Sequence, residues 1–251
     1  GGWAWQPTEA FRSATNWRAF MQAEGLADYP ELDRKAREQP EWFWDALLRH
    51  LDVRFRRPYS SVLDLSDGLP WPKWCVGATM NMTESLLDRH LEAGRGSHEA
   101  LAWESEEGAI RRLSYAALAE QVSRLASGLE SLGLGPGNAV GVYLPMTPEV
   151  AVAFLALARL GCVVLPMFSG FGASAIATRL NDAEAVALIT ADRCMRRGRE
   201  IDMKSVADDA AREVPTLRHL IVARRDETVR APATTGGEAG RGPGGGLREV
   251  E

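Results

Sequence analysis

The strongest constraint on the fold is a regular alternation of short apolar segments with longer amphipathic ones between residues 114 and 223. The apolar runs have the length of buried strands, and the amphipathic segments have helical periodicity. Buried strands that alternate with helices indicate βαβ crossovers, in which helices cover both faces of a parallel sheet. We therefore predict an α/β fold, a parallel βαβ sheet flanked by helices. The strands are expected at 139–144, 163–165, 185–190 and 219–223, and the helices at 114–132, 148–160, 173–181 and 204–213.

The region before this alternation differs in composition, because all eight tryptophans fall within the first 103 residues. Ser13 or Thr15 suits the N-cap of a short helix, and Pro40 suits the first position of another. Such short helices bury little surface alone, so we expect this region to depend on the second half. From residue 226 the sequence is rich in glycine and has no periodicity. The chain is thus expected to contain a mainly helical, loop-rich N-terminal cap, a sheet domain and a disordered tail, at residues 1–80, 81–225 and 226–251.

Composition excludes several classes of function. The 251 residues carry a formal net charge of −5, which argues against a nucleic-acid-binding protein. Cys75, Cys162 and Cys194 are widely spaced, which fits the reducing cytoplasm rather than a disulfide framework or a zinc site. No apolar run approaches the roughly 18 residues of a membrane span. The sequence begins without Met and without a basic-then-apolar leader, so we expect no signal peptide and either a partial reading frame or a processed chain.

Two glycine-rich stretches imitate phosphate-binding loops but lack the required context. Residues 133–137 follow a predicted helix and precede a strand, which is the reverse of the order in a dinucleotide fingerprint. Residues 236–246 lack the Lys-Ser/Thr pair of a phosphate loop. We interpret them as a turn and a linker. The four histidines show no metal-binding or catalytic spacing, so no catalytic constellation and no metal site are predicted.

Two other segments follow predicted strands and therefore lie at the carboxyl edge of the sheet, where ligands of open α/β sheets bind. The first contains Arg193, Arg196, Arg197 and Arg199, with Gly198 among them. Guanidinium groups suit phosphate oxygens, although a solvated loop explains the same charges. The second is the loop at 168–172, whose glycines and aromatic rings suit a planar ligand or, equally, a packing turn.

Together these segments resemble the acetyl-CoA synthetase branch of the adenylate-forming ligases. Trp3 opens a stretch similar to the family's leading segment, and the sequence KWCVGATMNMTESLLDRH resembles the end of its N-terminal cap. VGVYLPMTPEVAVAFLALARLG resembles the strand and helix that open the large domain. Later stretches resemble the family's F-G-G-F-S loop and its I-T-A-D…R-x-G-R segment. In the family's order, the similar segments are 3–20, 40–45 with 59–64, 73–90, 140–161 and 168–199.

The resemblance implies an AMP-forming acid–CoA ligase. In such an enzyme a short-chain carboxylate attacks the α-phosphate of ATP, with Mg expected, to give an acyl-adenylate and pyrophosphate. The thiol of CoA then displaces AMP. The arginines of R-x-G-R, which hold CoA near its 3′-phosphate, map onto Arg196 and Arg199, with Arg197 and Gly198 between them. The loop that lies against the CoA adenine and a neighbour of that ring map onto Phe168, Ser169, Gly170 and Ile201.

The same resemblance implies motifs that these 251 residues do not contain, above all the Ser/Thr/Gly-rich loop ending in Pro-Lys-Gly. We therefore expect ATP and Mg to bind only a longer enzyme, and CoA to find a partial site here. This polypeptide alone is expected to be inactive. Three alternatives stay open. The chain is part of an acetoacetyl- or propionyl-CoA synthetase, it is a non-catalytic module that binds CoA or a partner, or its Gly-rich end is a frameshifted or chimeric translation.

Overall fold

The computed structural model describes residues 4–106, 108–224 and 248–250, the last three without their side chains. The chain divides into two compact units, Gly1–Ser85 and Leu86–Glu251. The predicted cap, residues 1–80, falls within the first unit. Most of the predicted disordered tail lies outside the described residues, although Arg248–Val250 forms a strand.

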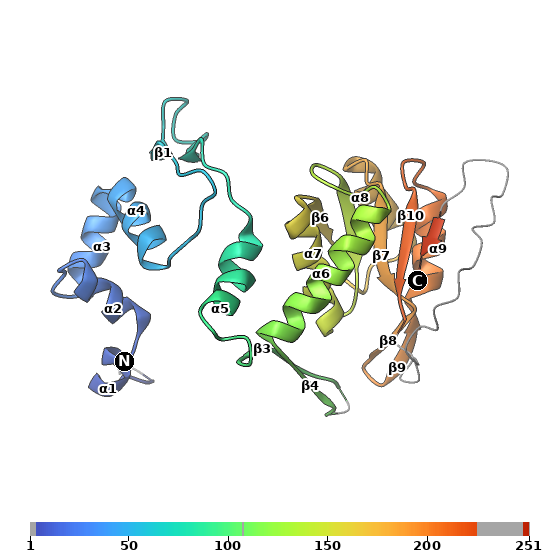
Figure 1. Ribbon diagram of the computed structural model, residues 1–251, viewed down its shortest axis with the longest axis horizontal. Helices are drawn as coiled ribbons and strands as arrows, with labels where there is room; N and C mark the ends of the chain where they lie inside the picture. The colour runs from blue at the N-terminus through green and yellow to red at the C-terminus, as the bar shows by residue number, and fades with distance from the viewer. Residues whose placement is uncertain (1–3, 107, 225–247, 251) are drawn as a thin grey trace. The chain divides into compact units, whose positions relative to one another are not determined.

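The first unit begins with helices and ends with a β-hairpin (Figure 1). Thr15 caps the second helix by accepting a hydrogen bond from the Arg18 N–H, and Pro40 begins the fourth, as predicted. The core of this unit is small and contains Phe20, Met21 and Leu32. Its elements are α1 (Glu9–Ser13), α2 (Asn16–Ala23), α3 (Tyr29–Glu38), α4 (Pro40–His50) and the antiparallel strands β1 (Ser61–Asp64) and β2 (Lys73–Val76).

A π-helical turn, η1 (Glu84–Asp88), crosses the boundary between the units. In the second unit a short helix and a hairpin precede the alternating elements (Figure 1). The elements are α5 (Arg89–Glu92), β3 (Glu99–Glu104), β4 (Ile110–Ser114), α6 (Tyr115–Ser131), β5 (Ala139–Tyr143), α7 (Pro148–Leu160), β6 (Val163–Pro166), α8 (Ala173–Asp182), β7 (Ala187–Ala191), β8 (Arg193–Arg196), β9 (Arg199–Asp202), α9 (Met203–Arg212), β10 (His219–Ala223) and β11 (Arg248–Val250).

The predicted parallel sheet is confirmed. Its strand order is β11-β10-β7-β5-β6, and every neighbouring pair is parallel. Every residue of β7 is buried, as are the last four of β5, which requires cover on both faces. Helix α6 packs against α7, and α8 packs against α9. The order places β6 and β7 on opposite sides of β5, so the direction of winding reverses between β5 and β7.

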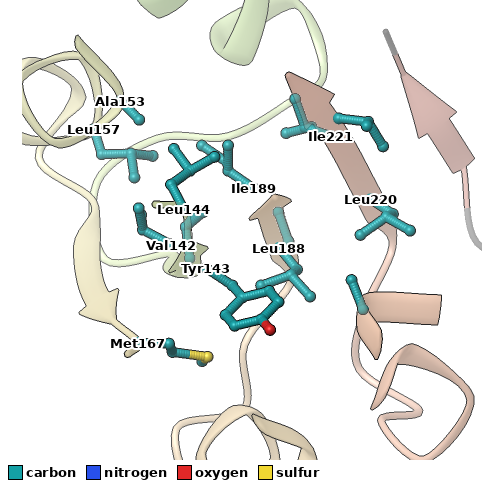
Figure 2. Close-up of a cluster of buried hydrophobic side chains, with 14 of the residues drawn as sticks. Val142, Tyr143, Leu144, Ala153, Leu157, Met167, Leu188, Ile189, Leu220 and Ile221 are labelled. Atoms are coloured by element: carbon teal, nitrogen blue, oxygen red, sulfur yellow. The ribbon is translucent and has the colours of Figure 1, made fainter. Parts of the chain in front are cut away.

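The core of the second unit is dense around this reversal (Figure 2). Tyr143, Leu157 and Leu188 are each at most 1% exposed. Gly141 lies in the middle of β5, where a side chain does not fit. A Cβ atom added there would lie 2.7 Å from Leu180 Cδ2 and 2.8 Å from Leu188 Cδ1. The sheet is therefore a rigid base for the loops that leave its carboxyl edge.

The structure differs from the sequence-based prediction mainly in its small hairpins. The cap, expected to be mainly helical and loop-rich, also contains the β1–β2 hairpin. The arginine segment, interpreted as a loop, is the β8–β9 hairpin. Two-stranded hairpins bury few side chains, so their sequences lack the clear alternation of apolar and polar residues that would predict a strand. In the described part of the chain, no helix combines the length and hydropathy needed to cross a membrane.

Candidate functional site: a cavity at the carboxyl edge of the sheet

The candidate site lies where the winding of the sheet reverses. Strand β5 ends at Tyr143 and β7 ends at Ala191, and these strands are neighbours. Adjacent loops leave a doubly wound sheet in opposite directions at such a point, and the crevice between them is where ligands bind. In space the strands follow the order β6, β5, β7, β10. This is the 2-1-3-4 strand order of flavodoxin-like sheets, in which the ligand binds between the first and third strands of the sequence.

Tyr143, at the end of β5, fixes the loop that follows β6, residues 167–172. The Tyr143 hydroxyl donates to the carbonyl oxygens of Ser169, at 3.2 Å, and Phe171, at 3.3 Å. Tyr143 is 1% exposed, and burial raises the pKa of its hydroxyl, so this group keeps its proton. The ring of Phe171 also packs edge-on against Phe168, with centroids 5.8 Å apart. These contacts give the loop a defined shape.

The β8–β9 hairpin carries the arginines. Its tight turn is formed by Arg197 and Gly198, both with positive φ, at 53° and 69°. This is the combination that two-residue hairpin turns require. The register places Arg196 directly opposite Arg199. Like charges opposite each other destabilise a hairpin, and no carboxylate of the described residues forms an ion pair with either arginine. The pair therefore concentrates positive charge at the end of the hairpin.

The arginine hairpin and the aromatic loop meet at one contact. The Arg196 guanidinium carbon lies 4.9 Å from the centroid of the Phe168 ring, a cation–π geometry. Gly170 makes this approach feasible. A Cβ atom there would clash with Arg196 Nη1 and lie 2.6 Å from Phe168 Cε1. The absence of a side chain at Gly170 therefore sets the position of both groups.

A cavity of about 310 Å³ opens beside this contact. One wall is formed by the ends of the sheet and the other by the β3–β4 hairpin. The Trp103 indole N–H donates to the Met146 carbonyl oxygen at 2.7 Å, which fixes the hairpin to the loop after β5. The lining residues are Trp103, Glu104, Ser105, Glu106, Pro145, Met146, Thr147, Phe168, Ser169, Cys194, Met195 and Arg196.

The predicted site residues take different positions around this cavity. Phe168, Ser169 and Arg196 line it. Arg197, Gly198 and Arg199 lie at the exposed end of the hairpin. Gly170 packs against Phe168 and Arg196. Ile201 does not line the cavity, because it is half-buried in β9 and packs against the main core. It lies opposite Cys194 in the hairpin register and so helps to anchor the hairpin.

The wall formed by the β3–β4 hairpin is not predicted from the sequence. Trp103, Glu104 and Glu106 lie more than 60 residues before the aromatic loop, and only the tertiary fold brings them to the cavity. Within the described residues, no cluster of three or more metal-binding side chains occurs. The cavity combines aromatic faces and one guanidinium group with the carboxylates of Glu104 and Glu106. Its aromatic faces suit a planar ring, and the guanidinium suits an anionic group.

An open, doubly wound sheet with a cavity lined by aromatic and charged side chains at its switch point is typical of the α/β proteins that bind ligands at this edge. Within this class, residues 87–242 match the family model described as AMP-binding enzyme, so the chain belongs to the AMP-binding enzyme family. Residues 29–86 match the model described as acetyl-coenzyme A synthetase N-terminus.

Individual relatives agree with both matches. The chain is 39% identical over 199 residues to an acetyl-coenzyme A synthetase of Deinococcus radiodurans, an alignment that covers 79% of this chain and 30% of that protein. It is 42% identical over 198 residues to an acetyl-coenzyme A synthetase of Mycobacterium tuberculosis, with coverage of 78% and 30%. Among solved structures, acetoacetyl-CoA synthetase from Streptomyces lividans aligns with a TM-score of 0.81 and 32% identity, covering 91% of this chain and 36% of that one. The chain thus spans about 30% of the length of these curated relatives.

Proposed function

We propose that the chain is the N-terminal part of an AMP-forming acid–CoA ligase of the acetyl-CoA synthetase type, acting in the cytoplasm on a short-chain carboxylate, ATP with Mg, and CoA. The proposal covers acetate, acetoacetate and propionate as acids, since the similar proteins include acetyl- and acetoacetyl-CoA synthetases. Within this enzyme, the residues described here form part of the CoA site. The reduced cysteines fit a cytoplasmic enzyme.

The observation that carries the proposal is the contact between Arg196 and Phe168 at the switch point. It joins the two segments that sequence resemblance assigns to the nucleotide end of CoA. The Phe168 ring offers a face for adenine, because every base has a π-face on which an aromatic side chain can stack. Arg196 and Arg199, opposite each other in the hairpin, offer guanidinium donors to the 3′-phosphate. A role in binding the 3′-phosphate would explain why Arg196 and Arg199 form no ion pair with a carboxylate of the described residues.

Calorimetric titration of the 251-residue chain with CoA and with 3′-dephospho-CoA tests the proposal. CoA should bind more tightly, because only CoA brings a phosphate to the hairpin. Arg196→Ala and Arg199→Ala should each weaken CoA binding about 10- to 100-fold, the loss expected for a charge-assisted contact. Both should leave dephospho-CoA binding nearly unchanged.

Arg212→Ala is the matched control. Arg212 is exposed in α9 and pairs with Asp209, so its removal takes away one positive charge without touching the cavity. Equal affinities for the two ligands, or an equal effect of all three substitutions, would contradict the assigned role of Arg196 and Arg199.

A further inference from the structure

The β3–β4 hairpin is held over the carboxyl edge of the sheet by polar contacts. Besides the hydrogen bond from Trp103 to Met146, the Arg111 guanidinium pairs with the Glu149 carboxylate at 2.7 Å. Burial opposes ionisation of Glu149, but hydrogen bonds from Thr147 and Arg111 together hold its pKa below the ordinary value. This ion pair joins β4 to the first turn of α7. The two strands of the hairpin are therefore held beside the loop after β5 and the start of α7.

Glu106, in the turn between β3 and β4, reaches the arginine hairpin. Its Oε2 atom accepts a hydrogen bond from the Gly198 backbone N–H at 3.3 Å. Gly198 belongs to the two-residue turn between Arg196 and Arg199. The contact thus places a carboxylate of the chain on the turn between the two facing arginines. A hydrogen bond from an amide to a carboxylate is charge-assisted, and the nearby guanidinium groups favour the same position for negative charge.

We propose that Glu106 is a resident carboxylate at the anion site of the β8–β9 turn, and that an anionic ligand must displace it. This proposal rests on the proposed function in one respect, since it takes the 3′-phosphate of CoA as that ligand. The phosphate binds the Gly198 N–H together with Arg196 and Arg199 once Glu106 has moved away. Because Glu106 is exposed, it moves without breaking a core contact. The apparent affinity for CoA is then reduced by the fraction of molecules in which Glu106 occupies the turn.

The decisive variant is Glu106→Ala, compared with Glu104→Ala. Both residues line the cavity and belong to the same hairpin, so each substitution removes one negative charge from the same surface. Only Glu106 contacts Gly198. Calorimetry should show CoA binding to Glu106→Ala about three- to tenfold more tightly than to the original chain, and to Glu104→Ala within about twofold. Binding of 3′-dephospho-CoA should change by less than about twofold in both variants, and thermal unfolding checks that both fold.

NMR of Gly198 tests the role of Glu106 separately from the proposed CoA site. The ¹H–¹⁵N resonance of Gly198 should shift in Glu106→Ala without any ligand, and inorganic phosphate should titrate it at a lower concentration than in the original chain. If Arg196→Ala leaves CoA binding unchanged, the proposed CoA site fails, while the phosphate titration still decides the role of Glu106. If Arg196→Ala weakens CoA binding but Glu106→Ala behaves like Glu104→Ala, the displacement proposal is wrong and the CoA site stands.

Discussion

At the scale of single residues, Gly170 controls the geometry of the cavity. A methyl group at this position would overlap the end of the Arg196 side chain and the edge of the Phe168 ring. Both side chains are flexible enough to turn aside, so the fold survives but the cation–π contact does not. Gly170→Ala should weaken CoA binding about tenfold, the loss of one charge-assisted contact. Calorimetry measures the affinity, and thermal unfolding should shift little.

Gly172→Ala supplies the comparison within the same loop. Gly172 precedes α8, has φ of −81°, and has no atom within 4 Å of an added Cβ. Its substitution should leave CoA affinity unchanged. If both variants bind CoA as the original chain does, the packing of Arg196 on Phe168 is irrelevant to the ligand.

Another residue-scale prediction concerns pH and the first unit. The Tyr59 hydroxyl lies 2.5 Å from Asp45 Oδ1, and Arg49 pairs with the same carboxylate. The hydrogen bond from Tyr59 lowers the pKa of Asp45, and the same bond raises the pKa of Tyr59 to about 12. A lowered carboxyl pKa stabilises the fold above the unfolded value of about 3.9 and is lost as pH falls. The raised tyrosine pKa stabilises it below about pH 10 and is lost as pH rises toward about 12.

Tyr59→Phe should therefore be less stable than the original chain near neutral pH, and the difference should shrink at both extremes. Urea unfolding at pH 7, 3 and 11.5 measures it. The pKa of Asp45, followed by NMR, should rise in this variant toward its usual range. A stability difference that is independent of pH would show that the tyrosine acts only through packing.

At the scale of elements, the glycines of β5 and α6 should respond to alanine in opposite directions. An added methyl at Gly141 would press on Leu180 and Leu188 in the centre of the core, and overpacking of this kind costs about 1–3 kcal/mol. Gly128 lies on the exposed side of α6 with open space around it. Alanine there should raise the free energy of unfolding by about 0.5–1 kcal/mol, because it favours the helix. Urea unfolding should give a lower free energy of unfolding for Gly141→Ala and a higher one for Gly128→Ala. A lower value for both variants would contradict the expected stabilisation at Gly128.

The elements also show what could be predicted from the sequence. The strands of the sheet were predictable because burial on both faces gives continuous apolar runs such as that of β7. Capping by Ser114, which accepts from the Ala117 N–H at 3.2 Å, was predictable because its pattern is local. The order of the strands in the sheet was not predictable from the sequence, because it depends on packing between helices that are distant in the chain. The hairpins were missed because their exposed strands carry mixed residues, as in the pattern of β4.

The candidate site likewise contains some features that were predictable from the sequence and others that were not. The aromatic loop and the arginines were predictable because each follows a strand, and parallel strands deliver such segments to one edge. That Arg196 packs on Phe168 depends on side-chain geometry, which no spacing encodes. Trp103 and Glu106 reach the cavity from a hairpin outside the sheet, and Ile201 faces the core rather than the cavity. These three positions depend on tertiary packing.

At the scale of the whole molecule, the two family matches meet where the structure divides. The first ends at residue 86 and the second begins at residue 87, while the compact units separate between Ser85 and Leu86. The boundary of the cap predicted from the sequence lies at residue 80. Five buried apolar residues form the core cluster of the first unit's described part, and this cluster is far smaller than the core around the parallel sheet. The first unit should therefore be the one whose amides exchange more readily with solvent.

The last prediction concerns the activity of the proposed enzyme. Transfer at the α-phosphate of ATP requires preorganised donors and cations for the charge that develops there. No Ser/Thr/Gly-rich loop ending in Pro-Lys-Gly occurs within these 251 residues. The isolated polypeptide should therefore bind CoA but release no pyrophosphate from ATP in the presence of acetate and CoA. The full-length Deinococcus radiodurans relative, assayed in parallel, provides the active reference. Pyrophosphate release by the 251-residue chain that depends on acetate would show that these residues suffice for adenylation.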